Sequence, residues 1–165
     1  MKKKVLITGL VVLCIAAILA CKLPWPTRYT LTMRGAQVTP EGAVIQEGDI
    51  VISGWKLNYL LEKDQLKFET LQLPGITFPK KLTNKQNILN GQITDYLSDR
   101  YDLVYTMVFL PEQNEFTGLH FFLSKDAGWC VIQEGFNNGY RYFAGSLQED
   151  FDPAALLEIC GLPSS

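Results

Sequence analysis

The fold is decided by residues 102–124, which read DLVYTMVFL-PEQN-EFTGLHFFLS. Two strand-like runs, 102–110 and 115–124, flank a polar link that contains a proline, and such a link is typical of a turn. Further strand-like runs follow at 128–134 and 139–147, each after a short turn-rich connection. Run 102–110 is apolar on both faces, which is typical of a central strand. This half of the chain therefore predicts four consecutive strands.

Two-residue alternation also marks the sequence upstream of this stretch. Residues 28–34 alternate between apolar and polar side chains, which predicts a half-buried strand. Run 49–61 repeats the pattern, and we expect Trp55 to face the core while Lys56 faces solvent. A short polar turn joins this run to run 65–73, so the two runs predict a β-hairpin.

Two other segments have helical spacing. In 83–100, apolar residues recur every three to four positions behind a capping-box pattern, which predicts a helix. Near the end, Asp152 is a predicted N-cap, Pro153 the first helical residue and Cys160 the last. The sequence thus predicts one α+β domain over 28–165 with a mostly antiparallel sheet. Its order is a meander, a helix, four strands and a terminal helix.

Composition and charge exclude some classes of partner. The chain has 165 residues, of which 47% are hydrophobic and 19% charged, so a packed core is expected. Setting aside the three lysines at positions 2–4 leaves 12 basic against 17 acidic residues, a net charge of about −5. A nucleic-acid-binding protein needs a basic surface to neutralise phosphates. We therefore expect no nucleic-acid partner.

The first 21 residues have the layout of a secretory signal. Lysines at positions 2–4 precede an uncharged apolar run over 5–20. The run ends in Ile18-Leu19-Ala20-Cys21, which resembles the lipobox of bacterial lipoproteins. The resemblance implies cleavage after Ala20 and a diacylglyceryl group on the sulfur of Cys21.

This resemblance implies a domain organisation and a location. Residues 1–20 are then a signal peptide, and 21–27 form the lipidated N-terminus and a tether. The membrane is the expected partner of the lipid, and the domain lies on the extracytoplasmic face of the cell membrane. An uncleaved signal-anchor helix is the alternative and gives the same location. The layout of the domain also resembles uncharacterised small lipoproteins of Gram-positive bacteria, a likeness that implies no function.

The chain has four cysteines, and two of them belong to the leader and the lipobox. The remaining pair, Cys130 and Cys160, is a disulfide candidate in an oxidising compartment. The alternative is a pair of buried thiols that act as small hydrophobic groups. Two thiols 30 positions apart and one histidine do not match a known ligand set. We therefore expect neither a metal site nor a cofactor.

His120 is the only histidine, so a hydrolase would have to use it with Cys130 or a carboxylate. Its strand face also carries Phe116 and Phe122, and a partly buried histidine among aromatic residues is the favoured interpretation. We therefore predict no catalytic residues.

Aromatic residues close to the C-terminus suggest a binding surface instead, because exposed aromatic side chains can hold sugars, peptides or a partner protein. The predicted surface consists of Phe136, Asn137, Asn138, Tyr140, Arg141 and Tyr142. The leading hypothesis is a non-enzymatic binding or assembly module of the cell envelope, with an envelope protein or a glycan as its partner. The alternatives are the hydrolase that uses His120 and an inhibitor or accessory subunit of another envelope protein.

Overall fold

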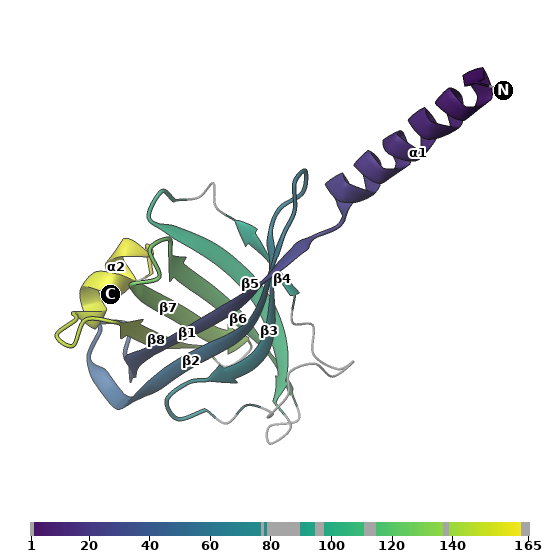
Figure 1. Cartoon of the computed structure of the whole chain (residues 1–165). Helices are drawn as coiled ribbons and strands as arrows, with labels where there is room; N and C mark the ends of the chain where they lie inside the picture. Colours follow the sequence, from purple (N-terminus) through teal and green to yellow (C-terminus); the bar gives the residue numbers. More distant parts are fainter. Residues whose placement is uncertain are drawn as a thin grey trace.

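In the computed structural model, the described residues are 2–76, 78, 90–94, 98–110, 115–136 and 139–162. Their strands form one closed antiparallel barrel in which each strand pairs with its neighbours in chain order (Figure 1). The elements are α1 (Lys2–Lys22), β1 (Trp25–Val38), β2 (Val44–Asn58), β3 (Gln65–Gln72), β4 (Asn90–Thr94), β5 (Tyr101–Leu110), β6 (Glu115–Ser124), β7 (Trp129–Phe136), β8 (Gly139–Ser146) and α2 (Pro153–Ile159).

The barrel closes between β1 and β8. The second half of β1, from Arg34 to Val38, pairs with β8. The first half of β1 continues beyond the end of β8 and pairs only with β2, as far as Trp25 opposite Asn58. Closure pairs both edges of β1 only over Arg34–Val38, and a paired edge cannot accept a further strand. The extended start of β1 leads to α1, which points away from the barrel (Figure 1).

The barrel interior is packed with side chains that alternate along the strands. Two aromatic rings stack in it, Phe68 of β3 and Phe121 of β6, with centroids 4.7 Å apart. An eight-stranded barrel is just wide enough for side chains to fill it. The other large, fully buried residues of the interior are Ile50, Ile52, Leu66, Val104, Val108, Leu119, Ile132 and Phe143.

A second hydrophobic cluster lies on the outside of the barrel, beneath α2. Leu156 and Leu157 of the helix pack onto outward-facing residues of the wall such as Val131 and Tyr142. The carboxylate of Asp152 accepts a hydrogen bond from the Ala154 N–H at 3.0 Å, which caps the helix. The predicted terminal helix and its cap are thus confirmed.

The predicted helix over 83–100 is wrong in the part that the structure describes. Residues Asn90–Thr94 form β4, which pairs with β3 on one side and β5 on the other. The buried side chain of Ile93 then belongs to the barrel core, and this packing outweighs the helical spacing. Residues 83–89 and 95–97 lie outside the described residues.

Two other predictions differ from the structure near β1 and β2. The first strand begins at Trp25, inside the range predicted as a tether. The predicted faces of Trp55 and Lys56 are reversed, because the fully buried Ile50 and Ile52 set which face of β2 points inward. Trp55 therefore lies outside the barrel. The coarser prediction of a mostly antiparallel sheet with helices is confirmed, and the sheet is a barrel.

Candidate ligand site at the barrel mouth

One end of the barrel opens into a cavity of about 440 Å³ that we call the barrel mouth. Strand β2, the β2–β3 hairpin, β4, the start of β5 and the β6–β7 turn contribute to it. A smaller cavity of about 130 Å³ shares Lys56, Ile93, Asp102 and Lys125 with the mouth and reaches the side chain of Tyr29 inside the barrel. The mouth is lined by Lys56, Leu61, Glu62, Lys63, Asp64, Ile93, Asp102 and Lys125.

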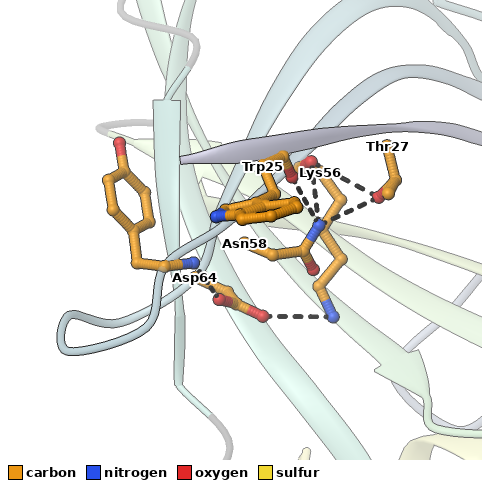
Figure 2. Close-up of polar contacts among 6 residues, drawn as sticks. Trp25, Thr27, Lys56, Asn58 and Asp64 are labelled. Carbon is orange, nitrogen blue, oxygen red and sulfur yellow. Dashed lines mark hydrogen bonds and ion pairs between the residues drawn. The ribbon is translucent and has the colours of Figure 1, made fainter. Parts of the chain in front are cut away.

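The β2–β3 hairpin holds one side of the mouth in place. The Lys56 ammonium lies 3.3 Å from the carboxylate of Asp64, which also accepts a hydrogen bond from the Tyr59 N–H at 2.9 Å. The side-chain amide of Asn58 donates to the Trp25 carbonyl oxygen at 2.8 Å (Figure 2). The first two contacts lie within the hairpin, and the third joins it to the start of β1. The rim of the mouth is therefore held by contacts to both β1 and β2.

The mouth carries charges of both signs. The three acidic residues of the lining face three lysines, and Lys56 is paired with Asp64. The ammonium group of Lys125 makes no ion pair within the described part of the chain. Lys125 follows β6 directly and is exposed, so its charge is available to an anionic group of a ligand.

Tyr29 lies at the inner end of the smaller cavity. Burial raises the pKa of Tyr29 to about 12, and the nearby Cys130 and Asp102 add to the shift. Its phenol is therefore neutral at physiological pH and can both donate and accept a hydrogen bond. The mouth and the smaller cavity together combine charged groups at the rim with a neutral hydroxyl group inside.

The structure separates His120 from Cys130. His120 lies on the outer face of β6, where its ring packs against that of Tyr105 with centroids 4.7 Å apart. Burial lowers the pKa of His120. The Cys130 thiol lies inside the barrel, 3.4 Å from the sulfur of Met33, and burial raises its pKa to about 12. The two side chains therefore lie on opposite faces of the barrel wall and form no dyad in the structure.

No disulfide joins Cys130 and Cys160 in the structure. Both residues are buried free thiols in the structure. Cys130 belongs to the interior of the barrel, whereas Cys160 packs with α2 against its outside. Successive side chains of a strand point to opposite faces, so the Cys130 side chain points inward while its neighbour Val131 packs with Cys160 beneath α2. The alternative of two buried thiols describes the structure instead.

The residues of the predicted aromatic surface do not share one face. Tyr140 and Tyr142 point outward with ring centroids 6.5 Å apart, but only Tyr140 is exposed. Arg141 points inward and binds the buried carboxylate of Glu134 at 2.6 Å. Phe136 ends β7. Asn137 and Asn138 lie outside the described residues.

The outer face of the barrel carries other exposed aromatic residues. Tyr105 of β5 and Phe116 of β6 are both exposed. The Tyr105 ring lies over Gly118, and the Tyr140 ring lies over Gly135. Gly118 and Gly135 are opposite each other in the pairing of β6 with β7. We call Tyr105, Phe116 and Tyr140 the outer aromatic face, and Tyr140 is the residue that it shares with the predicted binding surface.

Cys21 lies in the last turn of α1 and is half-buried. Within the described residues, the structure has no helix with the length and apolarity that crossing a membrane requires.

The residues of the mouth carry no signal in the sequence that marks them as a site. Lys56 was assigned to the outer face of a strand, and 62–64 only to a turn. No spacing motif connects these residues with Asp102 and Lys125, because they come from separate strands and turns that only the folded barrel brings together. Comparisons with protein-family models, with curated proteins and with solved structures return no match to this chain.

Proposed function

We propose that the protein is a lipid-anchored binding module on the extracytoplasmic face of the cell membrane. The lipid is attached at Cys21, and the barrel mouth binds a small polar ligand. The lipobox-like sequence 18–21 supports the anchor. The observation that carries the binding role is the cavity of about 440 Å³, which is within the size range of small-molecule sites.

The chemistry of the mouth favours binding over catalysis. Among the described residues, its lining provides ammonium, carboxylate and aliphatic groups but no histidine or thiol. General acid–base catalysis needs a group whose pKa is near the working pH, and the neutral phenol of Tyr29 is far from that range. We therefore assign these groups to ligand recognition.

The binding role predicts that Lys125→Met weakens ligand retention by about tenfold, because one charge-assisted hydrogen bond contributes about 1.5 kcal/mol. The protein is purified from the membranes of its own cells, and small molecules that remain bound are quantified by native mass spectrometry. Lys67→Met is the matched control, since Lys67 is an exposed lysine on β3 that does not line the mouth. Equal retention by the two variants would contradict a site at the mouth.

An assembly role is a second candidate, and the outer aromatic face supports it. Exposed aromatic side chains are enriched at protein–protein interfaces, and Tyr105 and Tyr140 are held over neighbouring glycines without being buried. A partner on this face would be an envelope protein, and the protein would then act as an inhibitor or an accessory subunit. Loss of partner capture in Tyr105→Ala, with capture intact in Lys125→Met, would favour this role.

A further inference from the structure

Large hydrophobic side chains are exposed at the end of the barrel where α1 joins β1. We call them the apolar tip: Leu23, Trp25, Leu60 and Leu61, with exposed fractions of 59%, 69%, 69% and 75%. The first two residues precede or begin β1, and the last two lie in the β2–β3 hairpin. Figure 1 shows that this hairpin projects from the barrel on the side where the chain continues to α1.

The two parts of the apolar tip are joined by direct contacts. Trp25 pairs with Asn58 in the sheet, and the Asn58 amide donates to the Trp25 carbonyl oxygen at 2.8 Å and to the Thr27 hydroxyl oxygen at 3.1 Å (Figure 2). The hairpin that carries Leu60 and Leu61 is therefore fixed beside the residue that carries the exposed indole. Trp25 and the hairpin therefore lie side by side on paired strands of the barrel.

The proposed anchor lies within a few residues of the tip. Cys21 precedes Leu23 by two positions and Trp25 by four. An extended chain covers at most about 14 Å over four residues. Acyl chains on the Cys21 sulfur enter the bilayer, so this short connection must hold the tip close to the lipid head groups.

The chemistry of the tip fits an interfacial layer. The indole of tryptophan combines a large apolar surface with one polar N–H, which suits the boundary between lipid and water. Exposed apolar patches on a soluble domain mark sites that contact a partner or a membrane. Charged residues next to the tip have both signs, as in Glu62 and Lys63. Contact with lipid would therefore depend on apolar area more than on lipid charge.

We infer that the apolar tip docks into the interfacial layer of the bilayer that holds the lipid anchor. Leu61 also lines the barrel mouth, so docking places the mouth at the level of the lipid head groups. The opposite end of the barrel, where the β1–β2 hairpin begins β2 at Val44, then points away from the membrane. This inference rests on the proposed lipid attachment at Cys21.

The test measures the depth of two labelled positions. The protein is purified from its own membranes and reconstituted into phosphatidylcholine vesicles, with an environment-sensitive fluorophore on Leu61→Cys or on Ile45→Cys. Ile45 is a matched control, because it is 58% exposed and lies roughly 40 Å from the tip along β2. Cys130 and Cys160 are buried, so the introduced thiol takes the label in the folded protein.

We expect a quencher attached to lipid head groups to quench the label at position 61 several-fold more than the label at position 45. Added salt should leave this difference unchanged, since the tip binds through apolar contact. With the label kept at position 61, Leu60→Glu should reduce the quenching. Val44→Glu, at the far end of β2, should not reduce it.

The outcomes separate the anchor from the docking. Flotation of the protein with the vesicles is measured first, and protein that does not float contradicts the lipid anchor and the docking together. Protein that floats but is quenched equally at positions 45 and 61 overturns the docking and leaves the anchor intact. A label at position 61 that is shielded from water but not quenched by the lipid shows that a second protein copy covers the tip, which also overturns the inference.

Discussion

Replacing Gly54 with alanine is expected to lower the free energy of unfolding by about 3 kcal/mol or more. Gly54 is buried in β2, where the pairing with β3 shifts register. A methyl group on it would overlap the carbonyl oxygen of Lys67 and lie 2.9 Å from the carbonyl carbon. Both atoms are backbone of the adjacent strand, so the barrel wall itself would have to move. Urea unfolding followed by circular dichroism measures the change.

Gly48→Ala is the matched control for this substitution. Gly48 lies on the same strand, but the nearest atoms to an added methyl group are side-chain atoms of Pro74 at 3.3 and 3.4 Å. A shift of a few tenths of an ångström in that ring relieves the contact, so we expect a loss of about 1 kcal/mol. Similar losses for Gly48→Ala and Gly54→Ala would contradict the tight strand contact at Gly54.

Replacing Arg141 with methionine is expected to destabilise the protein by about 2–3 kcal/mol. Glu134 is almost completely buried and accepts hydrogen bonds from Arg141 at 2.6 Å and from Thr117 at 2.5 Å. Removing one partner of a buried pair leaves an uncompensated charge and costs about 3–5 kcal/mol. The Arg141 side chain is 36% exposed, so water that replaces it would reduce this cost. The same urea experiment measures it.

Arg34→Met is the matched control for the Arg141 substitution. The Arg34–Glu47 pair has a similar distance of 3.0 Å, but both side chains are about two-thirds exposed. An exposed ion pair contributes about 0–1 kcal/mol. Equal losses for Arg34→Met and Arg141→Met would show that Glu134 is not buried as the structure places it.

The strands of the C-terminal half could be predicted because the strand-like runs in their sequence agree with the strands that form in the barrel. Runs 102–110 and 115–124 match β5 and β6 closely, and turn-forming residues separate them in the sequence. The segment that contains β4 could not be predicted in this way. Its apolar residues have helical spacing, whereas pairing with β3 and β5 decides its structure. Such pairing depends on residues far along the chain and leaves little local signal.

The candidate site could not be predicted because Lys56, one of its lining residues, was expected on the opposite face of its strand. The orientation of Lys56 follows from Ile50 and Ile52, because side chains two apart on a strand share a face. The two-residue alternation of run 49–61 instead predicts that Trp55, Leu57 and Tyr59 face the core. In the barrel the Trp55 indole N–H donates to the Glu69 carboxylate on the outside, at 2.8 Å. A hydrogen-bond acceptor on the neighbouring strand β3 thus stabilises tryptophan on the outer face of the barrel.

We propose that the barrel is attached to the membrane through a lipid on Cys21. Mass spectrometry of the N-terminal peptide, from protein isolated from the membranes of its own cells, tests this most directly. We predict a peptide that begins at Cys21 and carries a diacylglyceryl group, and an unprocessed precursor in Cys21→Ser. A peptide from the parent protein that contains Ala20 joined to an unmodified Cys21 would contradict the account and favour an uncleaved signal anchor.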